Sequence, residues 1–168
     1  FDQALGDLMN AKFSYSGQTC SAPKRIFIHH SIYDDFLEQL VDRVKNLQVG
    51  APEDPSTDVS PVASDLAVSR IKEQLKDAVD KKAQVLVGGR IEGNLVHPTV
   101  VRGATDEMAG MQEEMFGPVV FTSTFESVPE VIARSRNHKY GPRAAVFGGG
   151  DAKQVAGMLR GEPYCHPV

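Results

Sequence analysis

The sequence has few cysteines, no excess of positive charge and no long apolar run, and each absence excludes a class of protein. Its two cysteines, Cys20 and Cys165, lie far apart in different contexts. They do not form a disulfide framework, so we expect a reduced, cytoplasmic location. The net charge of −4 gives no basic footprint for a nucleic acid. No apolar run approaches the roughly 18 residues that span a bilayer, so we expect neither nucleic acid nor membrane as a partner.

The length and patterning of the chain indicate one α/β domain. With 168 residues, the chain can bury a core of its own but is too short for two ordinary domains. Strand-like runs alternate with amphipathic helical patterns, which is typical of a largely parallel sheet covered by helices on both faces. We therefore predict a three-layer αβα domain with a mostly parallel sheet. The expected strands are residues 25–30, 84–87, 99–101, 119–125 and 144–147.

Capping residues and apolar spacing place the helices between these strands. Ser31 is expected to cap a helix that ends before Gly50, and Pro61 to begin the next one. Ser127 and Glu130 form a capping box, and Asp151 is expected to cap the last helix, which ends near residue 160. The apolar stripes that support these predictions are Leu5, Leu8, Met9, Lys12 and Phe13 in the first helix and Val68, Ile71, Leu75 and Val79 in the third.

Cys20 lies in the segment Tyr15-Ser16-Gly17-Gln18-Thr19-Cys20, directly after the first helical pattern. Gly17 is expected to break that helix and to let the backbone pass close to other groups. An unperturbed thiol is mostly protonated at neutral pH, so attack by sulfur requires a setting that favours the thiolate. Nearby cations such as Lys24, and backbone N–H groups, could provide that setting. The residue types alone leave two interpretations open, a nucleophile and a small buried structural cysteine.

A second informative segment is Glu113-Glu114-Met115-Phe116-Gly117-Pro118-Val119, which precedes an apolar run. A carboxylate and an aromatic ring two residues apart can bind a sugar hydroxyl and pack against a flat ring. Gly-Pro before a strand is also ordinary turn chemistry, so this segment is a weak signal by itself. Glu113 is expected to be a solvated neighbour of Glu114.

The order and distance of these segments resemble the catalytic domain of the aldehyde dehydrogenase superfamily, over nearly the whole chain. Gly-Gln-x-Cys at residues 17–20 and Gln-Glu-Glu-Met-Phe-Gly-Pro at residues 112–118 form the most specific pair. The resemblance also includes Pro98-Thr99-Val100, the stretch from Ile28 to Phe36, and residues 137–141. It implies that residues 1–168 form the nucleophile-bearing catalytic domain, and that the dinucleotide-binding domain lies upstream of this segment in the same polypeptide.

The family assigns a role to each of these motifs. Cys20 corresponds to the catalytic nucleophile, which attacks an aldehyde and passes through a thiohemiacetal and a thioester. Glu114 holds a ribose of the cofactor, NAD or NADP, and Phe116 lies against its nicotinamide end. Thr19 and Ser21 are expected to line the aldehyde pocket. The general base and an oxyanion-hole asparagine belong to the missing upstream domain, so we expect the segment to be inactive alone and the full-length protein to be a homo-oligomer.

Three departures from the family pattern affect the expected substrate region. Tyr15 stands where an asparagine is common, Pro142 replaces an apolar residue, and residues 161–166 replace a segment that usually ends in asparagine. Two other functions remain open: an acylating or acyl-phosphate-reducing member of the superfamily, and a non-catalytic structural module.

The remaining polar features predict no further chemistry. His29 and His30 are adjacent on an expected strand, where neighbouring side chains point to opposite faces, so they cannot readily share a metal. We expect no metal site. Gly148-Gly149-Gly150 matches no phosphate-binding spacing and is interpreted as a turn, and Cys165 as a loop or core residue.

Overall fold

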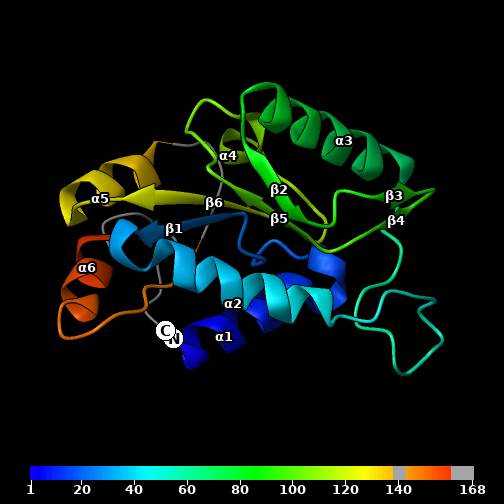
Figure 1. The fold of residues 1–168 in the computed structure, drawn as a ribbon, viewed down its shortest axis with the longest axis horizontal. Coiled ribbons are helices and arrows are strands. Elements are labelled where there is room, and N and C mark those ends of the chain that lie inside the picture. Colours follow the sequence, from blue (N-terminus) through cyan, green and yellow to red (C-terminus); the bar gives the residue numbers. More distant parts are fainter. Residues whose placement is uncertain (138–142, 160–168) are drawn as a thin grey trace.

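The computed structural model describes residues 1–137 and 143–159 and shows a sheet of four strands (Figure 1). The strands lie in the order β1 (Arg25–His29), β6 (Val119–Phe125), β5 (Thr99–Arg102), β2 (Gln84–Val87). β6 pairs in parallel with both β1 and β5, whereas β2 pairs antiparallel with β5. The prediction of a mostly parallel sheet is therefore confirmed.

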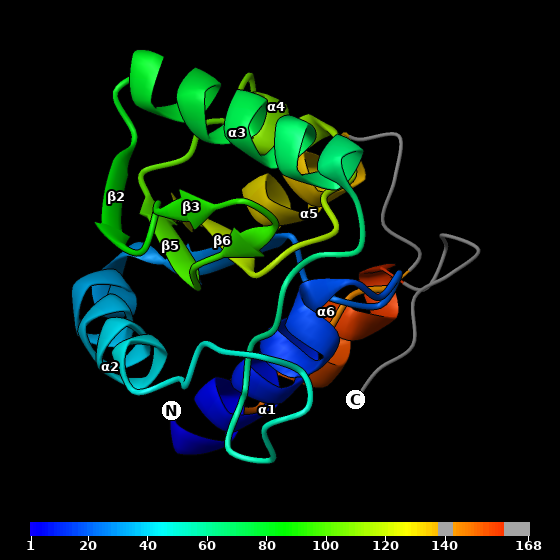
Figure 2. The ribbon, with the colours of Figure 1, turned by 90° about the vertical axis from the view of Figure 1, so that its right-hand side faces the viewer.

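Helices cover both faces of this sheet, as the alternation predicted. In Figure 1, α3 (Asp65–Asp80) and α4 (Ala109–Gln112) lie on one side, and α1 (Asp2–Phe13) and α2 (Tyr33–Lys45) lie on the other. The same layers are visible in the perpendicular view (Figure 2). The other described helices are α5 (Val128–Arg136), α6 (Ala152–Leu159) and two short 3₁₀ segments, η1 (Ser14–Gly17) and η2 (His30–Ile32).

Alternate residues of the central strands supply two separate apolar cores. In β6, Val119 and Phe121 pack with the α3 side, while Val120 between them packs with the α1–α2 side. β5 repeats the pattern with Val101 and Val100. Successive side chains of a strand point to opposite faces, so a central strand needs apolar residues at nearly every position. This is why the continuous apolar run of β6 occupies the middle of the sheet.

Several helix starts differ from the prediction. Ser31 does not cap α2; its hydroxyl lies 2.8 Å from His29 Nδ1, and η2 precedes the helix. Pro61 lies in the preceding loop, and Ser64 caps α3 by accepting a hydrogen bond from Ala67 N. Val79 is half exposed, and Ala78 takes the buried place in the stripe instead.

The capping box at the start of α5 is half confirmed. Ser127 Oγ accepts a hydrogen bond from Glu130 N at 3.4 Å. The Glu130 carboxylate, however, accepts from Glu126 N rather than from the cap residue itself.

One strand prediction was wrong, and one pair of strands was missed. Residues 144–147 form no strand, because a strand requires a pairing partner and none of the four sheet strands pairs with them among the described residues. A short hairpin of β3 (Ile91–Glu92) and β4 (Leu95–Val96) was not predicted. The predictions for His138–Gly141, Pro142, residues 161–166 and Cys165, and the end of the last helix at residue 160, lie outside the described residues.

None of the helices within residues 1–137 and 143–159 has the length and hydropathy of a bilayer-spanning segment.

Candidate functional site

Cys20 is exposed on a tight turn between η1 and β1. Ala22 N donates to Thr19 O at 3.2 Å and closes this turn around Cys20 and Ser21. The thiol is accessible, which excludes the interpretation as a buried structural cysteine. Its position before an edge strand fixes one end of the turn to the sheet.

Gly17 brings the two predicted motifs into direct backbone contact. Its φ of +70° lies in the left-handed region, and a Cβ at this position would clash with the carbonyl oxygen of Gly117. Gly117 in turn packs against the end of the Ile71 side chain of α3, which would have to shift to admit a side chain at position 117. The close approach expected of Gly17 is therefore present, and the group that it approaches belongs to the Glu114 segment.

Two polar side chains attach the Cys20 segment to the loop before α3. Ser16 Oγ donates to Ser60 O at 2.8 Å and accepts from Ser60 N at 2.9 Å. Gln18 Oε1 accepts from Ala63 N at 2.7 Å, while its Nε2 donates to Tyr15 O at 3.3 Å. These bonds hold η1 although Tyr15 and Ser16 both have a positive φ, which costs energy for residues with a Cβ.

Glu114 and Phe116 follow α4 in an extended segment. Gln74 Nε2 of α3 donates to the Glu114 carbonyl oxygen at 3.1 Å, which fixes the backbone there. Met115 is buried, whereas the Phe116 ring is 39% exposed. The Glu114 side chain is partly exposed and Glu113 is fully on the surface, as expected. The segment thus presents a carboxylate and part of an aromatic face to solvent.

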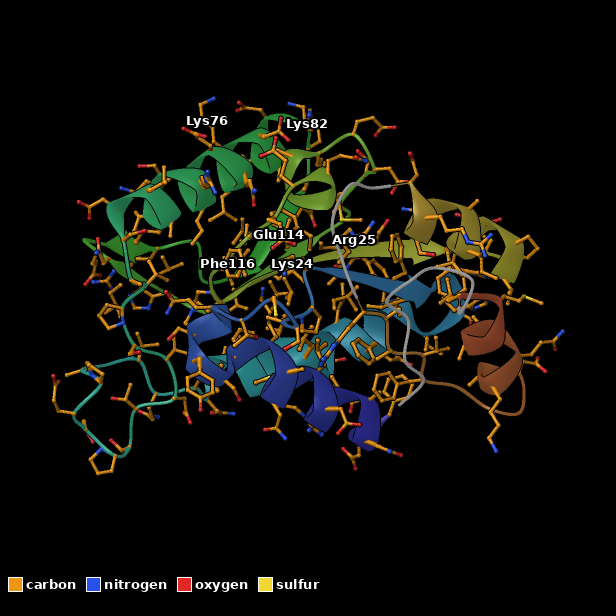
Figure 3. The ribbon with its side chains drawn as sticks, turned by 180° about the vertical axis from the view of Figure 1, so that it is seen from behind. Lys24, Arg25, Lys76, Lys82, Glu114 and Phe116 are labelled. Atoms are coloured by element: carbon orange, nitrogen blue, oxygen red, sulfur yellow. The ribbon has the colours of Figure 1, made fainter. Side chains whose placement is uncertain are left out.

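Lys24 joins this segment to the Cys20 turn, and Figure 3, from behind the view of Figure 1, shows Lys24 beside Glu114 and Phe116. Its Nζ lies 3.4 Å from Glu114 Oε1 and 5.3 Å from the centre of the Phe116 ring. The same ammonium group donates to the carbonyl oxygens of Cys20 at 3.5 Å and Ala22 at 3.3 Å.

Two cavities adjoin these residues. One, of about 340 Å³, is lined by Gln18, by Glu114, Met115 and Phe116, and by the first turns of α3 with Arg70. The other, of about 430 Å³, is lined by Tyr15, Gln18, Thr19, Ser60 and Ala63. Gln18 and Ala63 line both cavities, so the two cavities are adjacent. Of the two residues predicted to line the aldehyde pocket, Thr19 lines the second cavity and Ser21 is exposed.

Lys12 is a buried cation in this region that sequence reasoning did not identify. Its side chain is fully buried, and Nζ has no hydrogen-bond partner within the part of the chain that the structure describes. Burial, and secondarily repulsion from Lys24, lower the pKa of Lys12 to about 7, although attraction to Glu114 raises it. Lys12 does lie on the apolar stripe of α1, seven residues after Leu5, and this position was the sequence signal for its burial.

The site therefore brings together the Cys20 turn, the Glu114 segment and the start of α3. Of the predicted residues, Cys20, Glu114, Phe116 and Thr19 all lie in this region. Sequence reasoning missed the anchoring roles of Gln74 and Gln18, which give no local signal because their partners are far away in the chain. Among the described residues, no group of three or more His, Cys, Asp or Glu side chains could hold a metal ion.

Comparison with known proteins shows which family the chain belongs to. The sequence profile of the "Aldehyde dehydrogenase family" matches residues 1–160. Succinate-semialdehyde dehydrogenase [NADP(+)] 2 of Schizosaccharomyces pombe is 34% identical over 150 residues, which cover 87% of this chain and 30% of that protein. Human retinal dehydrogenase 2 is 36% identical over 149 residues, covering 87% of this chain and 29% of its own length.

Solved structures give the same result. An aldehyde dehydrogenase from Brucella melitensis biovar abortus superposes with a TM-score of 0.92 at 31% identity, over 99% of this chain and 35% of that one. Betaine aldehyde dehydrogenase of Staphylococcus aureus, solved with NAD+, has a TM-score of 0.92 at 33% identity over 100% of this chain and 36% of its own. The chain spans about a third of the length of the relatives it matches. It belongs to the aldehyde dehydrogenase family.

Proposed function

We propose that residues 1–168 are the nucleophile-bearing domain of an NAD(P)-dependent aldehyde dehydrogenase, with Cys20 as the nucleophile. The observation that carries this proposal is the backbone contact between Gly17 and Gly117. It joins an exposed cysteine turn directly to a segment that presents a carboxylate and an aromatic ring. A nucleophile and a cofactor-holding surface in one site are what the oxidation of an aldehyde requires.

Cys20 carries out the covalent part of the reaction. Its thiolate attacks the carbonyl carbon of a small-molecule aldehyde, so a C–S bond forms and the carbonyl oxygen becomes an oxyanion. Backbone N–H groups near Cys20 can stabilise this oxyanion. After oxidation the acyl group remains on Cys20 Sγ as a thioester, and attack by water breaks the C–S bond and releases the acid with the free thiol.

The site fits a nicotinamide dinucleotide, NAD or NADP. Glu114 and Phe116 line the same cavity of about 340 Å³, and both are partly exposed there. The carboxylate can accept hydrogen bonds from a ribose, and the ring can pack against the flat nicotinamide. When bound, the dinucleotide supplies the hydride acceptor. Holding the reactants in a fixed geometry lowers the entropic part of the barrier.

The remaining parts of the site come from outside residues 1–168 in this proposal. An upstream dinucleotide-binding domain of the same polypeptide provides most of the cofactor contacts, the base that activates water and an oxyanion-hole asparagine. The length of the relatives, about three times the matched region, supports this division. Thr19 and Ser21 line the aldehyde entry, and the full-length protein is a homo-oligomer.

The test is aldehyde-dependent NAD(P)H formation by the full-length protein and its Cys20→Ala variant. Loss of a covalent nucleophile costs about 10⁴-fold or more in turnover, so the variant should be almost inactive. Lys76→Met, which changes an exposed side chain of α3 outside the site, is the control and should keep its activity. Turnover of Cys20→Ala within about tenfold of the wild type would contradict the proposal, since a tenfold loss is only about 1.4 kcal/mol.

A further inference from the structure

The Lys24 ammonium group lies between the two halves of the proposed site. It contacts two carbonyl oxygens of the Cys20 turn, one carboxylate oxygen of Glu114 and the face of the Phe116 ring. These contacts belong to segments about ninety residues apart in the sequence. Lys24 therefore connects the nucleophile turn with the residues that we assign to the cofactor.

The number and type of these contacts suit a lysine. An ammonium group is an N–H donor with a full positive charge, and it donates to Cys20 O at 3.5 Å and Ala22 O at 3.3 Å while forming an ion pair with Glu114 Oε1 at 3.4 Å. The positive charge also lies over the aromatic face, where the ring quadrupole attracts it. The ammonium group thus satisfies two carbonyl oxygens of the Cys20 turn while its charge is shared between the Glu114 carboxylate and the Phe116 ring.

Burial makes this arrangement effective. The Lys24 side chain is 10% exposed and the Glu114 side chain is 23% exposed, so water competes less for either charge than at the surface. The ordinary surface ion pair of Lys76 with Asp80 on α3 offers a contrast, because both of its side chains are more than half exposed. Figure 3 shows Lys76 on the outer side of α3, away from Lys24 and Glu114. Partial burial keeps the Lys24–Glu114 ion pair in one arrangement, whereas water competes effectively for both charges of an exposed pair.

The atoms that the Lys24 ammonium group contacts show whether it acts on the Cys20 thiolate or on the Glu114 segment. From the sequence, Lys24 is a cation that could favour the Cys20 thiolate. In the structure its ammonium group donates a hydrogen bond to the carbonyl oxygen of Cys20 and forms an ion pair with the Glu114 carboxylate. Its positive charge therefore pairs with the Glu114 carboxylate, and the hydrogen bond to the Cys20 carbonyl oxygen holds the ammonium group in place.

We propose that Lys24 is a positioning residue for the nicotinamide dinucleotide. It holds the Glu114 carboxylate and the Phe116 ring at a fixed place relative to the Cys20 turn, so that both are ordered before the cofactor binds. This inference rests on the proposed function, in which Glu114 and Phe116 bind the cofactor. A side chain that is already ordered loses less conformational entropy on binding, and the ligand then binds more tightly.

The test measures steady-state kinetics of the full-length protein with NAD(P)+ as the varied substrate. Lys24→Met keeps the aliphatic stem and removes the charge; it should raise the KM for the dinucleotide about tenfold and change kcat about threefold or less, as expected for the ordering of one or two side chains. Lys24→Arg should restore most of the affinity. Lys76→Met is the matched control, since it breaks an exposed Lys–Asp pair outside the site, and should keep both constants.

A double-mutant cycle shows whether Lys24 acts through Glu114. In a Glu114→Gln background, the additional Lys24→Met change should cost about twofold or less, because the ion pair with the carboxylate is already lost and only the contact with the Phe116 ring remains. A merely structural role for Lys24 would give the same loss in both backgrounds. Lys24→Gln is a second neutral variant with the same expectation, and it serves where Lys24→Met fails to fold.

The outcomes separate this inference from the proposed function. Impaired cofactor use in Glu114→Gln, together with a normal KM in Lys24→Met or an equal loss in both backgrounds, overturns the inference and leaves the proposed function intact. Normal cofactor kinetics in Glu114→Gln overturn the assigned role of Glu114 and the inference together. A tenfold loss that disappears in the Glu114→Gln background supports both.

Discussion

The buried amine of Lys12 should make the stability of this chain depend on pH, and Lys12→Met should remove that dependence. The side chain is fully buried and its Nζ has no hydrogen-bond partner among the described residues. Burial lowers the pKa of Lys12 from its ordinary value of 10.5 to about 7. Methionine has a similar length and no charge, so the substitution removes the desolvated amine while keeping most of the packing.

The size of the effect follows from the pKa. A difference of one pKa unit corresponds to about 1.4 kcal/mol, so the shift from 10.5 to about 7 corresponds to about 5 kcal/mol between the protonated and neutral forms. Below pH 7 the amine is protonated in both the folded and the unfolded state, and the folded state bears the full cost. Between pH 7 and 10.5 only the unfolded state holds the proton, so stability rises with pH by up to about 1.4 kcal/mol per unit. Relaxation of the protein around a buried charge reduces the net effect, and we expect Lys12→Met to gain about 2–4 kcal/mol at neutral pH.

Urea unfolding of the 168-residue chain measures this directly. The free energy of unfolding is determined for the wild type and Lys12→Met at several values from about pH 6 to about pH 9, and the stability advantage of the variant should shrink as the pH rises. Lys72→Met, on the exposed surface of α3, is the control and should show a constant offset. Parallel curves for the wild type and Lys12→Met, or a variant that is less stable at pH 7, would refute the reasoning.

Three further predictions concern the Cys20 segment. Gly17→Ala should lower the free energy of unfolding by about 3 kcal/mol or more, because it adds a positive-φ penalty to a clash with Gly117 O; a loss below about 1 kcal/mol in urea unfolding would contradict the close contact. Tyr15→Asn should raise stability by about 1 kcal/mol, since asparagine tolerates the φ of +51° that Tyr15 adopts. An unchanged or lower melting temperature would count against that explanation. The chain alone should form no NAD(P)H with several aldehydes above a Cys20→Ala background, and measurable turnover would show that it contains a complete site.

The layers of the fold were predictable because the pattern of apolar residues indicates which faces of a strand are buried. The apolar run that starts at Val119 predicted a strand, the alternation of strands and helices predicted a sheet covered on both faces, and the structure places β6 between β1 and β5. Residues 144–147 have the same apolar character but no partner strand among the described residues. Local sequence does not contain the position of a pairing partner, and this is why that prediction was wrong. The β3–β4 hairpin did have a signal, because Gly93-Asn94 is a typical two-residue turn.

The site was predictable as a set of residues but not as a set of contacts. The sequence indicated that Gly17 approaches another backbone, whereas only the fold identifies Gly117 as its partner. Lys12 followed the helical stripe, but lysine is almost never fully buried without a partner, so its position on the stripe was not a sufficient signal for burial. Tyr15 stands where the family commonly has asparagine, and the positive φ at this position gives a physical reason for the asparagine.

The central claim is that Cys20 carries the acyl group of the substrate. The most direct test is to mix the full-length protein with an aldehyde and NAD(P)+, stop the reaction with acid within the first turnovers, and map the added mass by peptide mass spectrometry. We predict an acyl group on the peptide that contains Cys20, absent without the dinucleotide and absent in Cys20→Ala. An acyl group on Cys165 or on another residue, or active turnover with an unmodified Cys20 throughout, would contradict the account.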